Sequence, residues 1–232
     1  MFSFPIIRMS VSLVIPVLNE ALNIRAMAAA LALLQGHFDV VLVDGGSTDD
    51  TVKQAESCGL RIISAARGRG TQMNAGAAAT QGERLLFLHA DTHLPENALL
   101  LMDAALREPD VCGGHFRVRF AGADWGAKSL TRIYPLLIKL GLVYGDSGLF
   151  VRRSTFETVG GYRDWPLFED CDFYQRLRRT GRVVCLPATA VTSSRRFEGR
   201  FGRTFAHWTL LQVMYWLGVA PQRLARLYRL AR

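Results

Sequence analysis

Short apolar runs alternate with longer segments of mixed polarity along the first part of the chain. The run 11–15 is rich in β-branched residues and stops at Pro16, as expected for a buried strand. Similar runs predict strands over 38–43, 60–64 and 84–88. The intervening pattern predicts helices over 21–34 with Asn19 as cap, from Asp49 or Asp50 to about 58, over 72–79 and over 95–106. This strict alternation predicts a parallel sheet covered by helices.

The rest of the chain has a more mixed pattern. Apolar runs predict strands over 111–120, 147–151 and 183–186. Helical spacing of apolar residues predicts helices over 125–140, 169–180, about 203–217 and 221–231. Because no linker or repeat is evident, we expect an N-terminal extension at 1–10, one α/β domain at 11–200 and a helical tail at 201–232.

Composition narrows the class of protein. The chain has 232 residues, 50% hydrophobic and 21% charged, which excludes a disordered chain or a fibre. Its four cysteines contain no CxxC pair, so we expect neither a disulfide framework nor a structural zinc site. The net charge of +8 is uneven, since residues 173–232 contain twelve arginines and a single acid, Glu198. A uniformly basic nucleic-acid-binding protein has a different pattern, and we predict no nucleic-acid partner.

Polar side chains follow three of the predicted strands. Asn19 and Glu20 come after the first strand, Asp44 after the second and Asp91 after the fourth. Ligands bind at this edge of an open parallel sheet, and carboxylates there suit a hard cation such as Mg²⁺ or Mn²⁺. Any one such acid is more often a helix cap or turn residue, the role expected at positions 49 and 50. The sequence has no GxGxxG, GxxxxGK[ST] or GxSxG motif, which disfavours dinucleotide, P-loop and hydrolase sites.

Six motifs, in order, resemble those of a known family. They are 15–20 (IPVLNE), 43–51 (VDGGSTDDT), 89–91 (HAD), 145–153 (GDSGLFVRR), 169–170 (ED) and 195–197 (RRF). Together they resemble the successive motifs of family 2 glycosyltransferases, and the GDSGLF and HADT segments are similar to a compact bacterial biosynthetic subgroup. The resemblance implies the GT-A fold, a Rossmann-like, mostly parallel sheet flanked by helices that binds a nucleotide sugar.

The resemblance also implies roles for individual residues. Those expected to bind a nucleotide-diphosphate sugar donor are Pro16, Asn19, Glu20, Asp44, Arg69 (in preference to Arg67), Asn74, His89 and Ala90. A divalent cation, Mg²⁺ or Mn²⁺, is expected on Asp91. Glu169 and Asp170 match the catalytic pair, with Asp170 as the base. The acceptor side is expected at Asp146, Trp165 and Arg196.

Two positions depart from the family pattern. His89 stands where the family has the first acid of its DxD motif, so metal ligation is expected to rest on Asp91 and the diphosphate. The neutral imidazole is then expected to bond a ribose hydroxyl. Gly45 stands where a second acid is common, so one base contact is expected to be missing. Both departures concern the identity of the donor rather than the fold.

The expected function is metal-dependent, inverting transfer of a sugar to an acceptor hydroxyl, with a lipid-linked acceptor as one alternative. A single carboxylate base opposite the leaving group inverts the anomeric centre. Two other functions stay open. A sugar nucleotidyltransferase is disfavoured because no Gly-rich loop follows the first strand. A non-catalytic nucleotide- or nucleic-acid-binding module is disfavoured because Asp91 and Asp170 are intact.

The tail has a pattern of its own. Arginines recur every third residue from 223 to 232, after an uncharged segment, 204–222, that contains several aromatic residues. Binding to a bilayer interface, packing on the domain or on the second subunit of a homodimer, and a membrane span are the alternatives. Segment 1–10 lacks a charged n-region and a long apolar h-region. We therefore predict a cytoplasmic protein, with a peripheral position on the inner face of the cell membrane as the alternative.

Overall fold

One sheet organises the computed structural model, which describes residues 11–197 and 199–230. The strands are β1 Val11–Val17, β2 Phe38–Asp44, β3 Ile62–Ser64, β4 Arg84–Phe87, β5 Thr92–His93, β6 Val111–Phe120, β7 Leu149–Arg152 and β8 Arg182–Thr192. Among these residues the sheet has the order β3-β2-β1-β4-β7-β6-β8-β5. The pairs from β3 to β4 are parallel, β7 is antiparallel to both neighbours, β8 is parallel to β6, and β5 is antiparallel to β8. The predicted α/β class with a mostly parallel sheet is confirmed.

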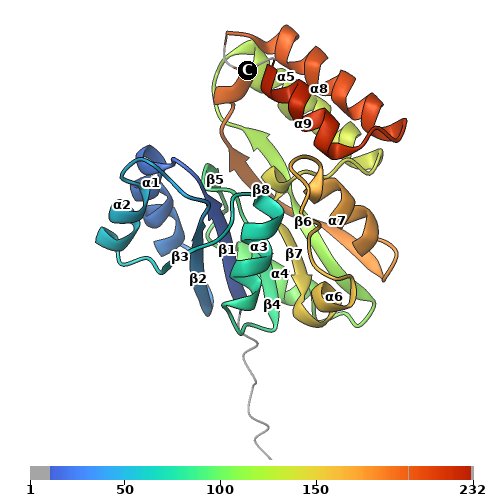
Figure 1. Cartoon of the computed structure of the whole chain (residues 1–232). Helices are drawn as coiled ribbons and strands as arrows, with labels where there is room; N and C mark the ends of the chain where they lie inside the picture. Colours follow the sequence, from blue (N-terminus) through green and yellow to red (C-terminus); the bar gives the residue numbers. More distant parts are fainter. Residues whose placement is uncertain (1–10, 198, 231–232) are drawn as a thin grey trace, which may run out of the picture.

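Helices cover both faces of the sheet and extend beyond one end of it (Figure 1). They are α1 Ala21–Ala32, α2 Thr51–Ser57, α3 Arg69–Ala78, α4 Ala98–Ala105, α5 Trp125–Lys139, α6 Arg153–Thr158, α7 Glu169–Leu177, α8 Phe201–Trp216 and α9 Pro221–Leu230, with short 3-10 turns η1 Gly145–Ser147 and η2 Arg195–Phe197. Helices α1, α2 and α4 contribute to one hydrophobic core and α3, α6 and α7 to a second. Helices α5, α8 and α9 gather at the upper end of the molecule in Figure 1.

The alternation along β1 explains why both faces are buried. Leu13 and Ile15 belong to the core that contains α1, whereas Val14 belongs to the core that contains α3. Because side chains alternate along a strand, a strand between two helical layers reads as one continuous apolar run. Helix α3 lies so close to the sheet that a Cβ at Gly76 would be 2.3 Å from Val14 Cγ1, so this position requires glycine.

The first strand continues past Pro16, contrary to the prediction that it stops there. Val14 accepts the last hydrogen bond from the β4 side, from the Leu88 amide at 3.1 Å. The β1–β4 ladder ends at the pair of Val14 with Phe87, whereas β2 still pairs with β1 to Val17. Because residues two apart in a strand point their N–H groups the same way, the missing N–H of Pro16 faces the side where no ladder bond is needed.

Other bounds differ from the prediction in ways the packing explains. Strand β8 extends well past the predicted 183–186, because a register shift lets it pass Pro187 and continue beside β6. The helix predicted over 95–106 begins at Ala98, and β5 and α6 were not predicted. The prediction that Asn19 caps α1 is wrong. Asn19 has a left-handed φ of 56°, and its Oδ1 accepts from the Thr48 amide at 2.8 Å instead.

The predicted helical tail is present as α8 and α9, which pack against the domain. Leu211, Leu224 and Ala225 are buried together with Leu167 and Phe168. The two helices are separated at residues 217–220, so the uncharged segment 204–222 is divided between them. Within the described part of the chain, no helix combines the length and apolar character needed to cross a bilayer. The side chain of Arg229 and all of Arg232 lie outside the described part, as does the predicted N-terminal extension, 1–10.

Candidate active site

The loops after β1 and β2 are held together by the polar residues that the sequence singled out. The buried Asp44 carboxylate accepts hydrogen bonds from the Gly46 amide at 3.0 Å and from both the amide and the hydroxyl of Ser47. The backbone N–H of Asn19 donates to Ser47 Oγ at 2.9 Å, and the backbone N–H of Glu20 donates to Thr51 Oγ1 at 2.8 Å. Asp44 therefore fixes the shape of the loop with both carboxylate oxygens.

Two further predicted donor residues lie in the packed interior. Pro16 is buried within β1, and Ala90 is a member of the hydrophobic core. The Asn74 amide donates to the Tyr162 carbonyl at 2.8 Å and accepts from the Tyr162 N–H at 2.9 Å. Both ends of this side-chain amide therefore bond the Tyr162 backbone, which ties α3 to the loop before α7.

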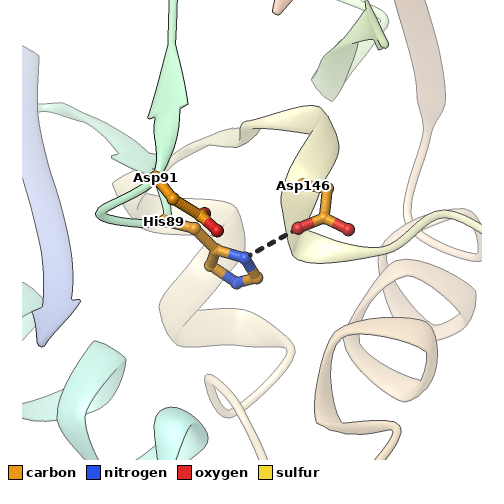
Figure 2. Close-up of side chains that lie close together, drawn as sticks. All are labelled: His89, Asp91 and Asp146. Atoms are coloured by element: carbon orange, nitrogen blue, oxygen red, sulfur yellow. Dashed lines mark hydrogen bonds and ion pairs between the residues drawn. The ribbon is translucent and has the colours of Figure 1, made fainter. Parts of the chain in front are cut away.

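His89, Asp91 and Asp146 converge at the edge of the sheet, and we call them the His–Asp cluster (Figure 2). One ligand atom from each lies within 4.8 Å of the others, and His89 Nδ1 is 3.1 Å from Asp146 Oδ1. The imidazole packs on backbone, since a Cβ at Gly145 would lie 2.3 Å from His89 Nε2. The set of one imidazole and two carboxylates suits a divalent cation.

The cluster brings together two residues that the sequence analysis assigned to different roles. Asp146 was expected on the acceptor side, and His89 among the donor-binding residues. The structure joins them because β7 pairs antiparallel with β4, with Leu149 opposite Phe87. The η1 turn that precedes β7 therefore lies beside the residues that follow β4.

Asp170 and Glu169 open helix α7 in two different environments. Asp170 is 4% exposed, and its two oxygens accept from the Gly145 amide at 2.7 Å and from the Cys171 amide at 2.8 Å. Glu169 is 1% exposed, and its Oε1 lies 2.6 Å from Arg69 Nε. Burial raises the pKa of Glu169 above its ordinary value, and the Arg69 guanidinium opposes that rise. The ion pair also raises the pKa of Arg69, so this guanidinium stays cationic.

The residue before this pair has a strained backbone. Phe168 has a φ of 64°, a left-handed conformation that costs a bulky residue on the order of 1–3 kcal/mol. Its ring stacks on Tyr215 of α8 with centroids 4.7 Å apart, and it lies edge-on to Trp208 at 6.3 Å. The tail thus packs directly on the residue that precedes Glu169 and Asp170.

A cavity of about 320 Å³ begins at Asp170 and continues between α5 and α8. Its wall contains Arg69, His89, Asp146 and Asp170, together with many apolar and aromatic side chains. Two tyrosines of this wall, Tyr134 and Tyr144, have a pKa raised by burial and by the nearby carboxylates, so both phenols stay neutral. We call this space the apolar cavity.

Of the two remaining acceptor-side predictions, Trp165 can be compared with the cavity wall. Trp165 is absent from it and packs instead under Arg163, whose guanidinium carbon is 5.0 Å from the ring centroid. The tail residues Trp208 and Trp216 line the cavity, which sequence reasoning missed because the packing partner of the tail was unknown. Arg196 belongs to η2, and its side chain lies outside the described part of the structure.

Comparison with known proteins identifies the family. The protein-family model described as glycosyl transferase family 2 matches residues 12–162 of this chain. The chain belongs to glycosyl transferase family 2. A PGL/p-HBAD biosynthesis glycosyltransferase of Mycobacterium bovis BCG is 36% identical over 176 residues, which cover 70% of this chain and 67% of that relative. The predicted glycosyltransferase class is confirmed, and neither alternative function is favoured.

Two further matches extend this result. An undecaprenyl-phosphate 4-deoxy-4-formamido-L-arabinose transferase of Sodalis glossinidius is 32% identical over 158 residues, 61% of this chain and 48% of that protein. The matched part of this chain therefore spans about half the length of the Sodalis protein. The solved structure of mannosyltransferase PcManGT from Pyrobaculum calidifontis, in complex with GDP-Man and Mn²⁺, aligns with a TM-score of 0.70 at 18% identity. The alignment covers 94% of this chain and 67% of that one, which establishes the predicted GT-A fold.

Proposed function

We propose that the chain transfers a sugar from a nucleotide-diphosphate donor to an acceptor hydroxyl, with Asp170 as the base. The observation that carries this proposal is the presence of Asp170 in one cavity wall with Arg69, His89 and Asp146. Backbone donors fix both oxygens of Asp170, which orients the carboxylate for proton transfer. The N-terminus of α7 stabilises the negative charge there.

The distribution of carboxylates supports transfer with inversion. Asp146 and Asp170 are the carboxylates of the cavity wall within the described residues. Asp146 bonds His89, and Glu169 is paired with Arg69, so Asp170 is the carboxylate left to accept a proton. One base that activates the acceptor hydroxyl gives a single displacement, which inverts the anomeric centre.

The His–Asp cluster is the proposed site of a divalent cation, Mg²⁺ or Mn²⁺. When bound, the cation supplies charge neutralisation for a diphosphate leaving group. Because Mg²⁺ prefers oxygen ligands, the imidazole of His89 favours Mn²⁺. The GDP-Man and Mn²⁺ named for PcManGT support both the metal and the class of donor.

The other residues of this edge suit the rest of the donor. Arg69 is half-buried and held by Glu169, so its positive charge is fixed beside the cluster, where the diphosphate would lie. The joined loops after β1 and β2, with Asn19, Glu20 and Asp44, form the proposed nucleoside side. A lipid-linked acceptor is supported by the undecaprenyl phosphate in the name of the Sodalis relative. Peripheral contact with the inner membrane face belongs to the same proposal.

A binding experiment tests the donor and metal together. UDP, GDP and their sugar conjugates are screened by thermal shift, with Mn²⁺ and with chelator, on the full chain. A ligand at 100 times its Kd stabilises the fold by about 2.7 kcal/mol. We expect Asp91→Ala to abolish the Mn²⁺-dependent part of this shift and the transfer reaction. Asp39→Ala is the control, because Asp39 lies near the start of β2, away from the carboxyl ends of the strands. Full activity in chelator would refute the metal assignment.

A further inference from the structure

The wall of the apolar cavity is far less polar than a site for a sugar or another hydrophilic acceptor needs. Four of its residues belong to the site described above, and most of the others are aliphatic or aromatic. Helix α5 contributes Leu130 and Leu137, and helix α8 contributes Phe205, Val213 and Trp216. A volume of about 320 Å³ lies within the range of small-molecule sites, which are lined mainly by such side chains.

The cavity opens at a surface that is itself apolar. Leu140, Val213 and Trp216 line the cavity and yet are 65%, 41% and 56% exposed, and we call them the cavity rim. Leu136 of α5 and Leu217, which directly follows Trp216 in the chain, are also exposed. Large apolar side chains gathered around an opening are typical of a binding site for an apolar ligand. The rim therefore indicates that carbon chains or rings enter the cavity from solvent or from a lipid surface.

One buried polar group in the wall lacks a hydrogen-bond partner. Gln212 is 5% exposed, and its Oε1 accepts from the Tyr144 hydroxyl at 2.8 Å. Its Nε2 has no hydrogen-bond partner among the described residues. Because buried amide groups are nearly always bonded, an unpaired N–H group in a ligand cavity indicates that the ligand supplies an oxygen.

We propose that the apolar cavity binds the acceptor, and that this acceptor is an amphiphilic alcohol whose hydrocarbon body fills the space between α5 and α8. The inference rests on the proposed transferase function, because Asp170 in the same wall is the group that accepts the hydroxyl proton. Gln212 donates to an oxygen of the acceptor and so selects an alcohol over a plain hydrocarbon. The rim admits the hydrocarbon part.

Binding of 1-alkanols to the full chain tests the hydrocarbon part of the proposal. The Kd of 1-hexanol, 1-heptanol and 1-octanol, measured by calorimetry, is expected to fall about fourfold with each added methylene. Val213→Arg should abolish this dependence by placing a charge in the cavity. Leu210→Arg is the matched control, since Leu210 is also exposed on α8, at 56% against 41% for Val213, but does not line the cavity. Affinity that ignores chain length, or equal loss in both variants, overturns the proposal.

The role of Gln212 has its own test. The wild-type chain should bind 1-octanol about fivefold more tightly than 1-chlorooctane, as expected for one net hydrogen bond. Gln212→Leu should remove most of this preference while 1-chlorooctane binds at least as well as before. A preference that survives in this variant shows that Gln212 is not the donor.

Binding of UDP with Mn²⁺, measured on the same variants, separates the two proposals. Val213→Arg is expected to keep nucleotide binding, because Val213 lies at the exposed rim of the cavity on α8, whereas the residues of the His–Asp cluster follow β4 and precede β7. If alkanols bind with the expected chain-length dependence and no nucleotide binds, the donor assignment fails and the apolar subsite stands. If nucleotides bind and alkanols do not, the acceptor inference fails and the donor assignment stands.

Discussion

Replacement of Asp170 by asparagine removes the proposed base while keeping the shape of the side chain. In the wild type, the Gly145 backbone N–H donates to the Asp170 carboxylate at 2.7 Å. In the variant, the asparagine oxygen can still accept from the Cys171 N–H, but the asparagine NH₂ group then faces the Gly145 N–H, and two donors cannot bond each other. A buried N–H left without an acceptor costs about 1–3 kcal/mol. For a chain of this size, each kcal/mol lowers Tm by roughly 2–4 °C, so Asp170→Asn should melt about 2–12 °C lower.

The catalytic effect should be larger than this loss of stability implies. At a temperature where the variant is fully folded, we expect the transfer rate to fall at least ~10²-fold, with donor affinity nearly unchanged. Asp172→Asn is the matched control, because Asp172 is buried in the same helical turn but pairs with Arg176 at 2.8 Å. It should lose stability and keep turnover. The reasoning is refuted if Asp170→Asn keeps turnover within a few-fold, or if Asp172→Asn loses as much.

Three further predictions follow from the site and the tail. His89→Asp gives the His–Asp cluster three carboxylates. The thermal shift that UDP produces should therefore become larger with Mg²⁺ relative to Mn²⁺ than it is in the wild type. An unchanged metal preference would count against His89 as a ligand. The pKa of Glu169 is raised from 4.5 by burial, so the protonated form stabilises the fold and this contribution is lost as pH rises through the raised pKa. Denaturant melts against pH should show this downward slope for wild type and lack it for Glu169→Gln; equal slopes would contradict the burial argument. Arg223 and Arg226 are exposed on α9. Each is expected to contribute about 1 kcal/mol to binding of anionic vesicles, so replacing both with glutamine should weaken co-sedimentation at low salt about 30-fold. If the wild type does not bind the vesicles at all, membrane contact through this face is excluded.

Local pattern was sufficient to predict the parallel half of the sheet, and long-range pairing limited the rest. Apolar runs located β1, β2 and β4 because a strand buried on both faces needs no partner to be recognised. The short strand β5 has no such signal, since Thr92 and His93 form it only by pairing with the far end of β8. The prediction ended strand β8 too early because Pro187 is typical of a strand end. In the structure, a register shift opposite Pro187 lets the strand continue beside β6.

The same limit applies to the site. The motifs placed Asp91 and Asp170 correctly at the edge of the sheet and the start of α7, because both positions follow from local elements. The contact of Asp146 with His89 depends on the antiparallel pairing of β7 with β4, which no local spacing reveals. The apolar cavity depends on how α8 packs, so Gln212 and Trp216 carried no signal in the sequence that distinguished them from ordinary core residues.

The strained Phe168 has a consequence for engineering of this enzyme. Its ring stacks against Tyr215 and it directly precedes Glu169 and Asp170, so the C-terminal helices pack beside the proposed catalytic pair as well as forming part of the cavity wall. Exchanging α8 between relatives to alter acceptor choice would also change how firmly Phe168 is held, and with it the rate of sugar transfer. On the proposed function, acceptor specificity and turnover are therefore coupled in this chain, and a chimera designed to redirect one is expected to need compensating changes at Phe168 to preserve the other.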